Sequence, residues 1–301
     1  MTAQADGPPA PDFTPERTRV LLAAACRQAG LDPAGAELLR HQTNAVYRLA
    51  TSPVIVKIAR PDYGLDDIQR TVGLTRWLTS LGFPTVPLLD VDQPVTIDGG
   101  VATFWRYLPQ HQPIEAGDIA GPLRELHQLA PPDLPVPRLD AVAAIRYSLD
   151  RQQILNAAEH AFLRDRCQTL ASELPLLQYE AAPVLIHGDP QHRNALWDAD
   201  RPVLCDWDSA VTGPAEWDLV TIEIHCRRFG HPASSYADFC RIYGRDIRDW
   251  PGYQVLKDLR ELRMIATNAR KSDPGSRAAA EVHRRITYLR AEETAENWAI
   301  L

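Results

Sequence analysis

Short apolar runs and two long helical patterns alternate over the first third of the chain. The runs have strand length and are bounded by turn residues, and the helical patterns end at Gly30 and Gly82. We therefore expect a helix at Glu16–Ala29, strands at Val46–Leu49 and Val54–Ile58, a helix at Leu65–Leu81, and strands at Val86–Leu89, Val95–Ile97 and Val101–Tyr107.

From Leu108-Pro109, which has the character of a hinge, the pattern becomes mainly helical. One interruption stands out, because three short apolar runs surround a polar turn at residues 198–201 and predict a β-hairpin with a preceding strand. We expect helices at Asp118–Leu129, Ala141–Glu159 and Ala161–Leu174, strands at Val184–Ile186, Ala195–Trp197 and Val203–Cys205, and helices from Trp217 to the end with breaks near Gly230, Pro251 and Pro274.

The loop before this hairpin has the most informative residues. It has the sequence His187-Gly188-Asp189-Pro190-Gln191-His192-Arg193-Asn194, and Asp206 follows twelve positions after Asn194. An aspartate in such a loop can take a proton from a hydroxyl group, whereas an asparagine oxygen and a second carboxylate suit Mg²⁺. This combination predicts phosphoryl transfer from a nucleoside triphosphate, in which catalysis is mostly positioning and charge neutralisation.

At these residues the chain resembles the aminoglycoside phosphotransferase (APH) family of protein-kinase-like enzymes. The signature is His-Gly-Asp-x-x-x-x-Asn, then Asp206-Trp207-Asp208, then an acidic helix entry at residues 213–219. The resemblance implies that Asp189 is the catalytic base and that Asn194 and Asp206 are metal ligands, and it does not make Asp208 a ligand.

Two further residues of the signature are expected to be structural. The resemblance implies that Asp218 caps or anchors the catalytic loop and that His187 orients the loop through backbone hydrogen bonds.

The resemblance also implies the fold class. We expect an α+β, bilobal protein-kinase-like fold with a small, mostly antiparallel-sheet N-lobe and a larger, mainly helical C-lobe. A length of 301 residues independently favours two lobes over one core. The expected division is a disordered tail at residues 1–15, a nucleotide-binding N-lobe at 16–108, and a C-lobe with the catalytic loop and substrate-binding helices at 109–301.

The resemblance places the nucleotide on the N-lobe. Lys57, in the apolar strand Val54–Ile58, is expected to reach the α- and β-phosphates. It is the only lysine before the catalytic loop, although an exposed strand lysine is the alternative. The remaining expected nucleotide contacts are Thr43 and Asn44 in the covering turn, and the backbone of Arg106, Tyr107 and Leu108 against the base.

One position departs from the family pattern, which has a glutamate on the helix after Lys57. The alignment puts Thr71 at that position, and no glutamate lies between Lys57 and Trp105. Asp67 lies one helical turn earlier on the same face and is the candidate replacement. The missing acid keeps open an alternative, a catalytically silent nucleotide- or ligand-binding pseudokinase.

Composition narrows the class of protein. A net charge of −7 argues against a nucleic-acid partner, and the absence of eighteen consecutive apolar residues argues against a membrane span. The five cysteines are scattered without a C-x-x-C pair, which favours a reduced, cytoplasmic protein without zinc. The first fifteen residues lack the basic and apolar parts of a signal peptide.

The sequence therefore predicts a small-molecule kinase. Mg²⁺ is the expected cofactor, and ATP or GTP the expected donor. The expected acceptor is a hydroxyl group of an aminoglycoside-like antibiotic, which would make the protein an antibiotic-resistance enzyme, or of another hydroxylated metabolite. Arg227 and Arg228 weaken the picture of a uniformly acidic acceptor site, whose candidate acids are Glu216, Glu223, Asp238 and Asp258.

Overall fold

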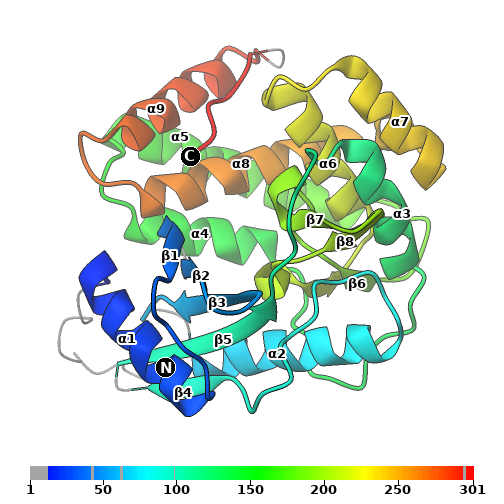
Figure 1. Ribbon diagram of the computed structural model, residues 1–301. Helices are drawn as coiled ribbons and strands as arrows, with labels where there is room; N and C mark the ends of the chain where they lie inside the picture. The colour runs from blue at the N-terminus through cyan, green and yellow to red at the C-terminus, as the bar shows by residue number, and fades with distance from the viewer. Residues whose placement is uncertain (1–12, 42–43, 62–63, 98, 294–295) are drawn as a thin grey trace. The chain divides into compact units, whose positions relative to one another are not determined.

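The computed structural model describes residues 13–41, 44–61, 64–97, 99–293 and 296–301 (Figure 1). The first twelve residues of the expected tail, and Thr43, lie outside the described residues. The chain divides into two compact units, of which the N-terminal unit comprises residues 1–113, 132–135 and 196–208, and the C-terminal unit the rest. The lobe boundary at residues 108 and 109 stays a prediction. In the described part of the chain, no helix has the length and apolar character that crossing a membrane requires.

The N-terminal unit is built on one five-stranded antiparallel sheet with strand order β1-β2-β3-β5-β4. Alternate residues of β3 face opposite sides of the sheet, so Val54, Val56 and Ile58 join the apolar core formed with α1. Lys57 is therefore on the other face. The elements are α1 (Pro15–Gln28), β1 (Glu37–His41), β2 (Asn44–Arg48), β3 (Val54–Ala59), α2 (Leu65–Ser80), β4 (Val95–Ile97) and β5 (Gly100–Arg106) (Figure 1).

One strand of this unit was not predicted, and one predicted strand is wrong. Residues 37–41 form the edge strand β1, which the apolar pattern does not reveal because an edge strand with exposed and half-buried side chains needs no apolar alternation. Val86–Leu89 is not a strand and makes only isolated bridges, Thr85 with Leu204 and Leu88 with Trp105. Pro87 interrupts this segment and has no amide hydrogen to donate.

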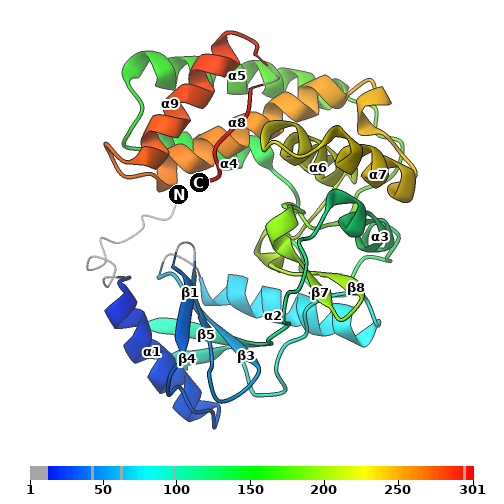
Figure 2. The same ribbon diagram turned by 45° about the horizontal axis from the view of Figure 1, so that its top comes forward.

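The C-terminal unit is mainly helical, and α8 (Tyr253–Lys271) packs against four of its helices (Figure 2). The other elements are α3 (Ala116–Leu126), α4 (Ala141–Arg151), α5 (Ala157–Glu173), β6 (Val184–Ile186), β9 (Val211–Gly213), α6 (Glu216–Arg228), α7 (Ala233–Tyr243) and α9 (Arg277–Arg290). The hairpin strands β7 (Ala195–Asp198) and β8 (Arg201–Leu204) pair with each other and, apart from Ala195, belong to the N-terminal unit. A sheet-based unit and a mainly helical unit confirm the α+β fold class.

The predicted helix Ala141–Glu159 is wrong in its extent. It ends at Arg151, and α5 begins at Ala157 behind a capping box, in which Asn156 and Glu159 each accept a backbone hydrogen bond from the other residue. The strand β9, which pairs with β6, was also not predicted.

A buried ion pair joins α6 to α8. Arg228 and Glu261 have side chains that are 2% and 1% exposed, and the Arg228 Nε lies 2.8 Å from the Glu261 Oε1. Arg227 also donates to this carboxylate, at 2.9 Å. Burial alone would raise the pKa of Glu261, but the hydrogen bonds and charges of the two arginines outweigh it and lower the pKa below 4.5.

Glu261→Ala should destabilise the protein by about 3–5 kcal/mol, because it leaves the guanidinium of Arg228 buried without its counter-charge. The folded-state pKa of Glu261 is lowered, so its contribution is present above pH 4.5 and is lost as pH falls through the folded-state value. Urea unfolding at pH 7 and pH 4 measures both effects. Asp238→Ala is the control, since Asp238 pairs with Arg241 at an exposed site and should cost less than about 1 kcal/mol.

Candidate functional site

Lys57 has a carboxylate partner within the N-terminal unit. Its ammonium lies 2.8 Å from the Oδ1 of Asp206, which is two residues beyond β8. Burial would lower the pKa of Lys57, but the charges of Asp206 and Asp208 outweigh it and raise the pKa. Lys57 is therefore a charged, positioned ammonium rather than an exposed strand lysine.

Asp206 has a left-handed backbone conformation, with φ of 67°. Aspartate tolerates this region better than most residues, and Ala199 and Glu292 share the conformation. The backbone at Asp206 thus turns sharply just after β8, at a residue that the sequence marked as a candidate metal ligand.

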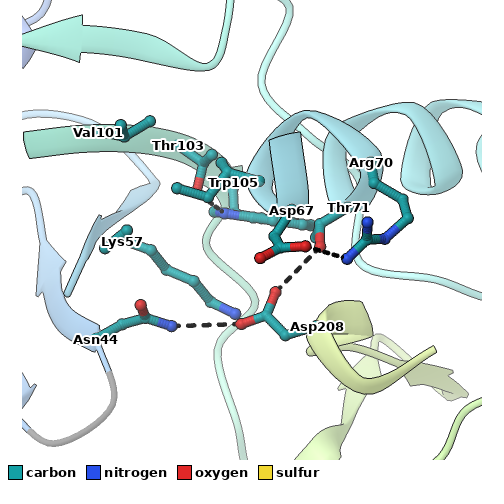
Figure 3. A pocket seen from close by; sticks show the side chains of 11 residues that line it. Asn44, Lys57, Asp67, Arg70, Thr71, Val101, Thr103, Trp105 and Asp208 are labelled. Atoms are coloured by element: carbon teal, nitrogen blue, oxygen red, sulfur yellow. Dashed lines mark hydrogen bonds and ion pairs between the residues drawn. The ribbon is translucent and has the colours of Figure 1, made fainter. Parts of the chain in front are cut away.

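Asp208 is held by two side chains that line the same pocket (Figure 3). Thr71 of α2 donates to its Oδ1 at 3.2 Å, and Asn44 of β2 donates to its Oδ2 at 3.5 Å. Burial and the charge of Asp206 raise the pKa of Asp208. Lys57 points toward Asp208 in Figure 3. Thr71 is at the position where the family has glutamate. It has no charge of its own, but its hydroxyl group holds the carboxylate of Asp208 at this pocket.

Asp67 lines this pocket as well, but its carboxylate accepts from Arg70 at 2.5 Å (Figure 3). Lys57 pairs with Asp206 rather than with Asp67.

The charges at this pocket favour a cation. Lys57 and Arg70 line the pocket together with the carboxylates of Asp67 and Asp208. Asp206, which does not line the pocket but pairs with Lys57, adds a third carboxylate, so the formal charges leave an excess of one negative charge. Their oxygens are hard donors of the kind that Mg²⁺ prefers. Within the described residues no cluster of three or more His, Cys, Asp or Glu side chains forms a complete metal site, so phosphate oxygens and amide oxygens would have to complete the coordination.

The hinge residues have defined backbone contacts. The amide of Arg106 donates to the carbonyl of Pro87 at 3.0 Å, and the amide of Tyr107 donates to that of Pro53 at 2.8 Å. The side chain of Arg106 pairs with Asp198. These two amides already have backbone acceptors, and the prediction that the backbone of Arg106, Tyr107 and Leu108 contacts the base edge stays a prediction.

In the C-terminal unit, the catalytic loop is fixed by Asp218. This fully buried carboxylate accepts the amide of His187 at 2.7 Å and the amide of Gly188 at 2.8 Å. His127 lies 3.1 Å from the same carboxylate, and Trp217 donates to the carbonyl of Gly188. The predicted anchoring role of Asp218 is confirmed.

Gly188 is required by the loop geometry. Its φ is 80°, and a Cβ added there would lie 2.2 Å from the carbonyl oxygen of Ser209. No other residue fits without moving the backbone. The ring Nδ1 of His187 faces the amide of Asp189 at 3.4 Å, consistent with its predicted orienting role.

The carboxylate of Asp189 is held on both oxygens. Arg260 of α8 donates to Oδ1 at 2.7 Å, and Gln191 donates to Oδ2 at 2.8 Å. Burial would raise the pKa of Asp189, but the charge of Arg260 outweighs it and lowers the pKa below 3.8. His225 is neutral at pH 7, because burial lowers its pKa to about 3.

Asn194 is buried beside Asp189 in the same unit. Its amide nitrogen donates to the Asp189 carbonyl at 2.9 Å and lies 3.3 Å from the Asp189 Oδ2. The amide oxygen of Asn194 is the atom that would coordinate a metal ion.

The four candidate acceptor acids each have an internal cation. Glu216 pairs with Arg245, Glu223 with Arg227, Asp238 with Arg241, and Asp258 with both Lys257 and Arg166. From the sequence we expected only Arg227 and its neighbour Arg228 to offset the charge of these acids. Pairing of this kind removes most of the attraction that these carboxylates would offer to a polycationic acceptor.

Sequence reasoning missed Asp208 and Arg260. The spacing of two residues after Asp206 was the available signal for Asp208. Arg260 had no local signal, since it lies 71 residues after Asp189 on a different helix.

Comparison with known proteins identifies the family. Residues 35–259 match the family model described as the phosphotransferase enzyme family, APH. A search of curated proteins found no significant match.

Solved structures share the fold at low identity. An amicoumacin kinase, solved in complex with AMP-PNP, Ca²⁺ and Ami, has 13% identity and a TM-score of 0.74, covering 94% of this chain and 97% of its own. A choline kinase from Streptococcus pneumoniae has 16% identity and a TM-score of 0.69, covering 92% and 99%. An aminoglycoside phosphotransferase from Streptomyces rimosus has 20% identity and a TM-score of 0.62, covering 81% and 98%.

These likenesses confirm the protein-kinase-like fold. The family match spans well over half of the chain and includes the catalytic loop and the Asp206-Trp207-Asp208 step. The chain belongs to the APH phosphotransferase family and is an ATP-dependent small-molecule kinase of that family.

Proposed function

We propose that this enzyme transfers the γ-phosphate of a Mg²⁺-bound nucleoside triphosphate to a hydroxyl group of a small molecule, with Asp189 as the base. The observation that carries the proposal is the held carboxylate of Asp189, bonded to Arg260 and Gln191 in a loop that Asp218 anchors. The acceptor oxygen forms a bond to the γ-phosphorus while the bond to the β-phosphate oxygen breaks. The acceptor's proton goes to Asp189, and the nucleoside diphosphate leaves.

A low pKa makes Asp189 a weak base, and this suits phosphoryl transfer. The transition state is loose, so little proton transfer is needed before the phosphorus–oxygen bond forms. A carboxylate that stays ionised accepts a hydrogen bond from the acceptor hydroxyl and directs its lone pair. Arg260 and Gln191 keep the carboxylate in one orientation, so its function is mainly positioning.

Lys57 and the carboxylates near it are proposed to handle the phosphates. Lys57 would neutralise phosphate charge, while Asp206 and Asn194 would be the protein ligands of Mg²⁺, which supplies charge neutralisation at the transferring phosphoryl group. The excess negative charge at the pocket of Lys57 and the hard oxygen of each donor support this assignment. Asn44 remains the proposed contact of the covering turn, the backbone of Arg106, Tyr107 and Leu108 remains the proposed contact of the base, and Thr43 stays a prediction.

The acceptor class is proposed from the relatives and the sequence together. The structurally similar kinases are named for an antibiotic, for choline and for aminoglycosides, all hydroxylated small molecules. We place the activity in the cytoplasm, because the five cysteines form no disulfide.

Asp189→Asn should lower turnover by about 10² to 10⁴, because a positioned base contributes rate enhancements of this size. Nucleotide affinity should stay close to that of the wild type, whereas thermal stability should fall, because the buried Arg260 loses its charged partner. Steady-state transfer to the true acceptor and calorimetric binding of ATP measure the two effects. Turnover of the variant near that of the wild type would refute the assignment; Asp238→Asn, an exposed change, is the control.

Asp206→Asn should remove the gain in ATP affinity that Mg²⁺ provides, because the carboxylate is the charged protein ligand of the proposed metal site. Metal-free ATP should bind at least as tightly as to the wild type, since one negative charge near the phosphates is gone. Calorimetry with and without Mg²⁺ separates the two affinities. Equal enhancement by Mg²⁺ in both proteins would show that the metal is held elsewhere.

Thr71→Val and Asp208→Asn should lower kcat/KM by non-additive amounts, because Thr71 positions Asp208 and the two act as one unit. The double variant should be barely worse than Asp208→Asn. Asp67→Asn should stay within about threefold of the wild type, since its carboxylate bonds Arg70 at an exposed pair. A large loss with Asp67→Asn and none with Thr71→Val would restore Asp67 as the acid that orients Lys57.

A further inference from the structure

The charge around Asp189 differs in sign from the charge around Lys57. Two guanidinium groups of α8 lie at the catalytic base: Arg260 binds Asp189, and Arg263 is three residues further along the same helix face. Both lie over the ring of Trp217, with guanidinium carbons 5.5 Å and 5.4 Å from the ring centroid. The ring of Trp217 therefore brings the two cations side by side, and its indole nitrogen bonds the loop at Gly188.

Arg263 differs from the other arginines at this place. Within the described part of the chain, the guanidinium of Arg263 bonds neither a carboxylate nor another hydrogen-bond acceptor. It lies over the ring of Trp217, whereas Arg260 is paired with Asp189. Burial first, and then repulsion from Arg260, lower the pKa of Arg263 to about 10, against the opposing attraction of Asp189. A half-buried cation in this state gains most from an added negative charge.

Two guanidinium groups, Arg260 and Arg263, face the carboxylate of Asp189, while the carboxylate of Asp218 is buried against the backbone amides of the loop. His225 adds no charge at pH 7, since its pKa is about 3. The acids that would favour an amine, Glu216, Glu223, Asp238 and Asp258, are all neutralised by internal cations. A polyamine would meet repulsion here, whereas a carboxylate would find a partner.

We infer that the acceptor is a hydroxylated anion, and that Arg263 binds its anionic group, a carboxylate in the simplest case, while the hydroxyl lies at Asp189. This inference rests on the proposed function for the role of Asp189 and deepens it by naming the acceptor class. Arg263 is then a specificity-determining residue. The acceptor class is opposite in charge to the cationic molecules for which the structurally similar choline and aminoglycoside kinases are named.

Two matched acceptor series test the inference, each varying only one terminal group. The first is D-gluconate, D-glucitol and D-glucamine, and the second is glycerate, glycerol and aminopropanediol. Binding to the full-length protein with Mg²⁺ and ADP is measured by saturation-transfer NMR, which needs no turnover. The variants are Arg263→Met, Arg263→Lys and, as a matched control, Arg270→Met, because Arg270 lies on the same helix over the ring of Tyr147, 5.5 Å from its centroid.

In each series that binds, the carboxylate should bind most tightly. Arg263→Met should weaken its binding about 10- to 100-fold, the range for hydrogen bonds to charged groups, with Arg263→Lys in between and Arg270→Met without effect. The neutral and cationic members should be unchanged or bind better to Arg263→Met. If no carboxylate binds more tightly than its counterparts, or if Arg263→Met and Arg270→Met have equal effects, the inference is overturned.

Phosphate transfer from ATP, measured in parallel, separates this inference from the proposed function. Carboxylate binding that depends on Arg263 without transfer to any acceptor would refute the proposed role of Asp189 and leave the anion site standing. Transfer to an amine at a rate that Arg263→Met does not change would refute the anion site and leave the phosphotransferase.

Discussion

The catalytic loop depends on one fully buried carboxylate. Asp218 accepts hydrogen bonds from two consecutive backbone amides, those of His187 and Gly188, and these bonds fix the chain just before Asp189, the proposed catalytic base. Burying a carboxylate without partners costs folding free energy. The two amides and the nearby ring of His127 therefore stabilise Asp218, and Asp218 in turn fixes the loop. The loop consequently has one low-energy arrangement, which a positioned base requires.

The same dependence extends outward through Trp217, the neighbour of Asp218 on α6. Its indole bonds the loop carbonyl of Gly188, and its ring lies under both Arg260 and Arg263. Arg260 in turn holds Asp189. Anchor, base and specificity-determining cation are thus set by two adjacent residues at the start of one helix, so changes at Trp217 would affect catalysis and acceptor choice together.

Much of the fold was readable from local pattern. The hairpin strands, the helix after Lys57 and the loop signature all have short-range signals, and the role of Asp218 followed from the family pattern. The residues that complete the site could not be predicted in this way, because their positions depend on tertiary contacts. Arg260 reaches Asp189 from a distant helix, and Thr71 reaches Asp208 across 137 positions. The prediction missed the edge strand β1 and wrongly assigned a strand to Val86–Leu89 for a different reason. The apolar content of a segment does not show which of its backbone groups find hydrogen-bond partners.

Charge pairing explains why acid content was a poor guide to the acceptor. The chain has 39 acidic and 32 basic residues, which suggests attraction to cations, yet the sign at a site depends on which charges are left without partners. The four candidate acids of the C-terminal helices form internal ion pairs with Arg245, Arg227, Arg241 and Lys257. Because a paired carboxylate exerts little field beyond its partner, the single guanidinium at Arg263 outweighs several nearby acids in choosing the ligand. A fold shared with kinases named for amine-containing acceptors is therefore compatible with an anionic one, as acceptor choice follows this local balance and the phosphoryl-transfer residues do not change with it.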